Sequence, residues 1–155
     1  MTYRLGKTSL KRLEGVHPDL VRVVHRAIIL TEQDFTVMEG VRTMDRQIEY
    51  VRKGISRTLN SKHLVQPDGY GHAVDLVPWE NGQARWEWPL IYPIAAAMRQ
   101  AAEEVGITLR WGGVWDRSLS ELGYRDADMI AAVEAYVERH PGPDFIDGPH
   151  YEVMA

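Results

Sequence analysis

The chain has 155 residues, of which 45% are hydrophobic and 26% are charged, and it contains no cysteine. This length suits one globular domain, and the absence of thiols excludes disulfide scaffolds, thiolate metal sites and cysteine nucleophiles. The formal charge of -4 argues against electrostatic binding to nucleic acid or to an anionic membrane. Any metal ion would therefore be bound by His, Asp or Glu.

Hydrophobic periodicity, caps and turn residues predict an irregular order of helices and strands. Residues 55–71 form a long loop, of a length that is often functional, and Asn81-Gly82 marks a two-residue hairpin. Because helices and strands do not alternate regularly, we expect an α+β domain with a mainly antiparallel sheet flanked by helices. The predicted helices cover residues 18–30, 44–53, 89–105 and 126–140, and the predicted strands cover residues 35–39, 72–77, 107–111 and 150–154.

Neither a membrane span nor a leader is expected. No apolar run approaches the ~20 residues that cross a bilayer. The segment Met1-Thr2-Tyr3-Arg4-Leu5-Gly6-Lys7 lacks the apolar core of a signal peptide. We therefore expect a protein that is made in the cytosol and does not insert into the membrane.

Half of the histidines have an ordinary structural explanation. His17 precedes the proline of a helix start, His25 lies within an amphipathic helix, and His140 lies in the last turn of a helix, where a cation is favoured. The others lie next to glycines and carboxylates and are candidate ligands: His63, His72 and His150.

Asp75 lies within the predicted strand of residues 72–77. Alternate side chains of a strand share a face, so Asp75 faces with Ala73 and Val77, while His72 faces the other way. A buried carboxylate among apolar residues needs a partner. A salt bridge, a turn cap and a metal ion are the alternatives.

The C-terminal segment adds a third group of ligand type. His150 follows Pro149, with Asp147 three residues before it and Glu152 two residues after it. Either carboxylate is a candidate general base.

His63, Asp75 and His150 together have the composition of a catalytic zinc site, two His and one carboxylate with an open position for water. His72 is the competing ligand, less favoured because it faces away from Asp75.

Four segments, in this order, resemble motifs of the D-alanyl-D-alanine carboxypeptidase-like zinc peptidases: Ser61-Lys62-His63, Gly71-His72-Ala73-Val74-Asp75-Leu76, Trp111-Gly112-Gly113 and Asp147-x-Pro149-His150-Tyr151-Glu152. This family includes the D-Ala-D-Ala dipeptidases of vancomycin resistance and phage endolysins that cleave the L-alanyl-D-glutamate bond of peptidoglycan. The resemblance extends from about Val37 to Glu152 and implies a hedgehog/DD-peptidase-like fold. The small size and the missing export signal are most similar to the endolysin branch.

The resemblance implies zinc as the cofactor, with His63, Asp75 and His150 as its ligands and Asp147 as the general base. Arg42 matches an arginine that stabilises charge on the substrate carbonyl in relatives.

The alternative for Arg42 is an ion pair with Glu39 or Asp45. Glu152 resembles an acceptor that orients a ligand histidine, and Ser61 is expected to support the His63 loop.

Trp111 belongs to one of the matching motifs and is expected to support the site or to contact substrate. The chain is rich in tryptophan, and we expect two or three of these side chains in the core and the rest as apolar walls of a substrate groove: Trp79, Trp86, Trp88, Trp111 and Trp115.

The chain departs from the family pattern at two places. Leu64–Tyr70 is an insertion between His63 and Gly71, expected to be a compact turn that reshapes the groove or admits His72 as a ligand. Val114 stands where many relatives have an acidic residue, so that carboxylate is missing here or comes from Asp116.

The function implied by the resemblance is zinc-dependent hydrolysis of the L-alanyl-D-glutamate bond of the peptidoglycan stem peptide by a phage endolysin. We expect residues 1–155 to form one catalytic domain without a separate cell-wall-binding domain, acting as a monomer. The enzyme would be made in the host cytoplasm and reach the wall through a separate membrane pore.

Three alternatives stay open: a D,D-carboxypeptidase or dipeptidase acting on the same polymer, a non-catalytic peptidoglycan-binding module, and a metal-free structural domain. A serine hydrolase is disfavoured because no G-x-S-x-G motif is present.

Overall fold

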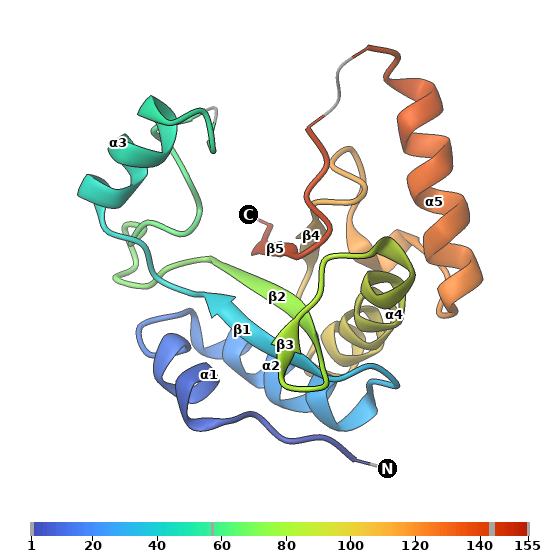
Figure 1. The fold of residues 1–155 in the computed structure, drawn as a ribbon. Coiled ribbons are helices and arrows are strands. Elements are labelled where there is room, and N and C mark those ends of the chain that lie inside the picture. Colours follow the sequence, from blue (N-terminus) through green and yellow to red (C-terminus); the bar gives the residue numbers. More distant parts are fainter. Residues whose placement is uncertain (1, 57, 143–144, 155) are drawn as a thin grey trace.

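The computed structural model describes residues 2–56, 58–142 and 145–154. Its centre is a five-stranded sheet in the order β1-β2-β5-β4, with β3 paired to β2, and every pair is antiparallel (Figure 1). The prediction of an α+β domain with a mainly antiparallel sheet is therefore confirmed. The strands are β1 Phe35–Glu39, β2 Ala73–Glu80, β3 Gln83–Ala84, β4 Leu109–Trp111 and β5 His150–Val153.

The helices lie around this sheet. Four of them match predicted helices, and His17 caps α2 as expected, because its Nδ1 accepts a hydrogen bond from the Asp19 N–H at 3.1 Å. The six-residue α1 was not predicted, since Gly6 at its N-terminus supplies no side-chain cap. The helices are α1 Lys7–Arg12, α2 Pro18–Leu30, α3 Met44–Arg52, α4 Trp88–Val105 and α5 Asp126–Arg139, with a short 3-10 helix at Leu119–Glu121.

The hydrophobic core lies between the sheet and helices α2, α4 and α5. Helix α4 packs against both α2 and α5, and Leu20 and Met98 are fully buried at the first of these contacts. Trp111 of β4 is also fully buried and stacks on Tyr151 of β5, with ring centroids 6.5 Å apart. Within the described residues, no helix combines the length and apolar composition needed to cross a membrane.

The pairing of β5 with its neighbours determines which side chains meet. Asp75 of β2 lies directly opposite His150 of β5 and also opposite Glu39 of β1. Side chains directly opposite one another on adjacent strands share a face of the sheet. Three polar side chains from distant parts of the chain therefore form one row across three strands.

Gly112 follows the last residue of β4, at a point where the segment that leads into β5 lies close to it. Its N–H donates to the His150 carbonyl, and its carbonyl accepts from the Asp147 N–H, both at 2.8 Å. A Cβ on Gly112 would overlap the backbone oxygen of Asp147. Its φ is not positive, so close approach rather than backbone conformation requires glycine here.

We predict that Gly112→Ala lowers the free energy of unfolding by about 1–3 kcal/mol, because the added methyl group separates two hydrogen-bonded segments. Urea denaturation measures the change. Gly6→Ala is the matched control, since no atom lies within 4 Å of a Cβ there, and its effect is expected within about 0.5 kcal/mol. Equal stability of the two variants would contradict the prediction.

Candidate active site

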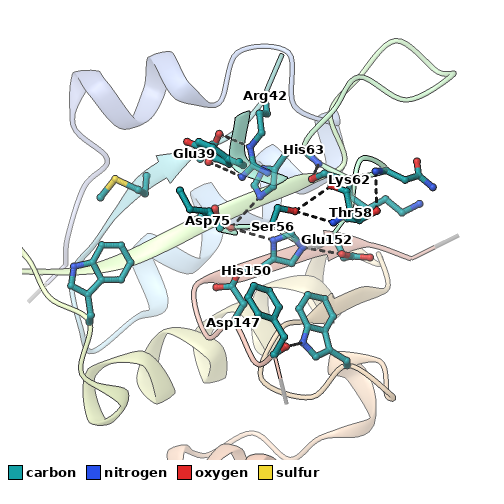
Figure 2. A pocket seen from close by; sticks show the side chains of 18 residues that line it. Glu39, Arg42, Ser56, Thr58, Lys62, His63, Asp75, Asp147, His150 and Glu152 are labelled. Atoms are coloured by element: carbon teal, nitrogen blue, oxygen red, sulfur yellow. Dashed lines mark hydrogen bonds and ion pairs between the residues drawn. The ribbon is translucent and has the colours of Figure 1, made fainter. Parts of the chain in front are cut away.

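A pocket of about 610 Å³ lies over the row of polar side chains on the sheet. Most of the predicted site residues line it, and Figure 2 shows the labelled ones converging from separate segments. They come from β1 and the turn after it, from the loop before β2, from β2 itself and from the C-terminal segment. The lining includes Arg42, Ser61, His63, Asp75, Asp147, His150 and Glu152.

The three predicted metal ligands meet at one carboxylate oxygen. Asp75 Oδ1 lies 3.2 Å from His63 Nε2 and 3.2 Å from His150 Nδ1. The ligand atoms of the three residues all lie within 4.8 Å of one another, and both histidines are buried. This arrangement can hold a metal ion.

The outer nitrogens of both histidines face hydrogen-bond acceptors. His63 Nδ1 lies 2.8 Å from the Gly40 carbonyl oxygen, and His150 Nε2 lies 2.8 Å from Glu152 Oε1. Carbonyl and carboxylate oxygens only accept, so these outer nitrogens are protonated. In the neutral rings the lone pairs then point inward at Asp75, which fits a cation between the three groups.

The electrostatics of the metal-free triad agree with this interpretation. Burial lowers the pKa of His150, but hydrogen bonds to Asp75 and Glu152 outweigh it and raise the pKa to about 10. Burial raises the pKa of Asp75, but the charges and hydrogen bonds of His63 and His150 hold it well below its usual value. A proton on His150 thus occupies the place of a cation, and a bound metal ion would displace it.

A second His/Asp cluster has the opposite hydrogen-bond polarity. His72 Nε2 lies 2.7 Å from Asp68 Oδ2, and His17 lies beside it with ring centroids 5.2 Å apart. The Nδ1 atom of His17 accepts from a backbone N–H, so the Nε2 atom of a neutral His17 is protonated and offers no lone pair. One of its two histidines thus has no lone pair left for a metal ion. His72, the competing ligand, therefore lies apart from the triad.

Asp147 lies beside the triad on the wall of the pocket. Among the described residues, its carboxylate has no hydrogen bond or ion pair within the usual distances. Burial and the negative charge of Asp75 raise its pKa, partly opposed by the positive charges of His150, His63 and Arg42. An unpaired, half-buried carboxylate with a raised pKa is a suitable proton acceptor.

Arg42 is held firmly at the pocket wall. Its Nε and Nη2 donate to the two Glu39 oxygens, both at 2.8 Å, and its Nη1 donates to Gln47 Oε1 at 2.7 Å. The guanidinium also lies over the Tyr50 ring, 4.6 Å from its centroid. The ion pair with Glu39 is thus present, and it orients Arg42 beside Asp75.

Ser61, Glu152 and Trp111 were expected to support the ligands, and each makes a hydrogen bond that does so. The Ser61 hydroxyl accepts from the His63 N–H at 3.1 Å, and Glu152 accepts from His150. Trp111 does not reach the pocket; its Nε1 donates to the Gly148 carbonyl at 2.7 Å and so supports the segment between Asp147 and His150.

Both departures from the family pattern lie away from the pocket. Leu64–Tyr70 forms a compact turn, closed by hydrogen bonds between Gln66 and Tyr70 and between Gly69 and Gln66, and it does not line the pocket. Val114 is buried. Asp116 pairs with Arg139 at 2.9 Å and supplies no carboxylate to the site.

Three contributions were missing from the sequence-based prediction. They are the Gly40 carbonyl behind His63, the Gln47 amide behind Arg42, and the contact of Trp115 with His150, ring centroids 5.4 Å apart; Trp115 itself was among the tryptophans expected in the core or as groove walls. Gln47 is fully buried on α3. A glutamine on the apolar side of a helix is the only signal that marks any of them.

We predict that a divalent cation binds at this triad and that His63→Ala abolishes the tight binding, measured by isothermal titration calorimetry with zinc as the probe, because it removes one of the three candidate ligands. Glu152→Ala is expected to lower zinc affinity about 10- to 100-fold through the lost hydrogen bond to His150. His72→Ala is the matched control and is expected to bind one zinc ion like the wild type. A lower stoichiometry in that control would contradict the assignment.

Comparison with known proteins agrees with this geometry. Residues 1–154 match the family model described as phage L-alanyl-D-glutamate peptidase. The L-alanyl-D-glutamate peptidase of Escherichia phage T5 is 34% identical over 122 residues, which cover 76% of this chain and 85% of that protein. The crystal structure of the Serratia marcescens L-Ala D-Glu endopeptidase ChiX superposes with a TM-score of 0.71 at 38% identity, covering 96% of this chain and 87% of that one. The chain belongs to the phage L-alanyl-D-glutamate peptidase family.

Proposed function

We propose that this protein is a zinc-dependent phage endolysin that hydrolyses the L-alanyl-D-glutamate bond of the peptidoglycan stem peptide. Membership of the peptidase family supports the reaction and the substrate. The observation that supports the metal is the inward-facing set of His63, Asp75 and His150, whose outer hydrogen bonds leave lone pairs toward one point. The two-His, one-carboxylate composition is typical of catalytic zinc.

Zinc, when bound, supplies a Lewis acid that polarises a carbonyl group and lowers the pKa of water toward ~7. The protein supplies the rest of the site. Gly40 and Glu152 hold the two ligand rings in orientation. The Trp115 ring lies 5.4 Å from the His150 ring and forms part of the pocket wall.

Asp147 is the proton carrier in this proposal. One oxygen of its carboxylate accepts the proton of the attacking water, and the same oxygen then donates that proton to the amine nitrogen of the leaving D-glutamate. Without a metal ion, burial and the charge of Asp75 raise the pKa of Asp147, which makes its carboxylate a stronger proton acceptor for the first transfer. The peptide bond is replaced by a carboxylate on L-alanine and a free amine on D-glutamate.

Arg42 contributes positive charge at the opposite wall. Three of its donor nitrogens are bonded to Glu39 and Gln47, so the guanidinium is fixed before substrate arrives. Its remaining N–H groups and its charge favour the negative oxygen that develops on the attacked carbonyl.

We predict that Asp147→Asn lowers turnover of purified Gram-negative peptidoglycan about 10²- to 10⁴-fold at matched zinc occupancy, because the amide accepts no proton. Mass spectrometry of the fragments measures the products, and new N-terminal D-Glu with intact glycan is expected for the wild type. Asp116→Asn is the matched control, since Asp116 pairs with Arg139 away from the pocket.

Other fragment patterns would point elsewhere. Loss of terminal D-Ala would identify a carboxypeptidase with the same site. No cleavage by the zinc-loaded wild type would indicate a binding module instead.

We also propose that the protein acts as a monomer, is made in the host cytoplasm and reaches the wall through a separate membrane pore. Expression in a bacterium is then expected to be tolerated until the inner membrane is breached. Optical density, followed before and after chloroform is added, checks this prediction. Prompt lysis without permeabilisation would contradict it.

A further inference from the structure

The wall of the pocket has an excess of negative charge. Among the described residues, its charged side chains, besides the two ligand histidines, are four carboxylates and two cations: Glu39, Asp75, Asp147 and Glu152, with Arg42 and Lys62. One bound divalent cation neutralises that excess. A substrate that brings its own carboxylate then needs a local positive group.

The two cations differ in the hydrogen-bond partners that they already have. Arg42 is bonded to both oxygens of Glu39 and to Gln47. Lys62 is half-buried, and the described residues give its ammonium group no hydrogen bond or ion pair within the usual distances. Among the described residues of this wall, Lys62 is therefore the cation that is available to a ligand.

Glu152, on the same side of the pocket as Lys62, already has other partners. Glu152 accepts from His150 Nε2 at 2.8 Å, and its other oxygen lies 3.6 Å from Arg110 Nη1. Lys62 lies at the same side of the pocket as Glu152, where Figure 2 labels both.

The backbone below Lys62 is fixed next to the catalytic centre. The Lys62 carbonyl accepts from the His72 N–H at 2.8 Å, and the following residue is His63, whose N–H donates to Ser61. A flexible four-carbon side chain on a fixed base places a mobile point charge beside the ligands.

The substrate has a carboxylate at the corresponding position. Glutamate has two carboxyl groups, and only one is used when the chain continues beyond it. The other stays free within a few bonds of the scissile nitrogen. A charged hydrogen bond to that group would distinguish D-glutamate from a residue with an amide or an apolar group there.

We propose that the ammonium group of Lys62 binds the free carboxylate of the D-glutamate residue and determines the preference for glutamate on the leaving side of the bond. This inference rests on the proposed function, since it concerns the substrate of that same site. Lys62 contributes specificity and touches no reacting atom.

The test compares two synthetic muropeptides that differ only at the free carboxyl group of D-Glu, a carboxylate in one and a carboxamide in the other. For the zinc-loaded wild type, we predict a kcat/KM about 10- to 100-fold higher for the carboxylate. Lys62→Met is expected to lose this ratio, because its kcat/KM falls more for the carboxylate than for the carboxamide. Lys62→Arg is expected to restore part of it.

Lys53→Met is the matched control, because Lys53 pairs with Glu49 on the exposed side of α3, 2.8 Å away, and it is expected to keep the wild-type ratio. A wild type that cleaves both muropeptides equally would overturn the inference and leave the proposed function intact. So would a Lys62→Met variant that keeps the full preference. No cleavage of either muropeptide by the wild type would overturn the proposed function, and this inference with it.

Discussion

The Oδ1 atom of Asp75 is the point on which the active site depends. Two histidine nitrogens approach it at 3.2 Å, inside a pocket whose other carboxylates repel an additional negative charge. A buried carboxylate in such surroundings needs a positive charge, either a proton on His150 or a cation between the three ligands. The surrounding contacts serve this need: the Gly40 carbonyl and Glu152 orient the rings, and Arg42 balances the charge from the side. The arrangement of charges around Asp75 therefore strongly favours a cation at this one position.

The two histidine clusters of this protein differ in whether a hydrogen-bond acceptor or a donor contacts the outer nitrogen of the ring. Both contain two histidines and one aspartate within ligand distance. In the pocket, acceptors stand behind the rings, so lone pairs face inward. At the start of α2, a backbone N–H stands behind His17, so a proton faces Asp68 and His72 instead. The two clusters have the same ligand composition. The hydrogen-bond partners of the histidine rings distinguish the candidate metal site from the helix cap.

The sequence contained the ligand set but not the contacts that hold it. His63, Asp75 and His150 were predicted from residue types and from the alternation of side chains along one strand, and the structure brings them together. The Gly40 carbonyl behind His63 was not predictable, because every residue has a carbonyl and 23 residues separate the two. The choice for Arg42 between substrate and Glu39 was also undetermined, since the geometry of the turn after β1 decides it. Helix α1 was missed because no capping side chain marks its start. Local patterns thus predicted elements and chemistry, whereas long-range backbone contacts came only from the structure.

The place of β5 in the sheet ties the ligand set to the integrity of the fold. This strand lies between β2 and β4, and it contributes both His150 and the outer acceptor Glu152. A chain cut before β5 would lose one of the three candidate metal ligands and the hydrogen-bond acceptor behind it. The same cut would leave β2 and β4 without the strand that joins them. A break in this short segment therefore removes the candidate site and the centre of the sheet together.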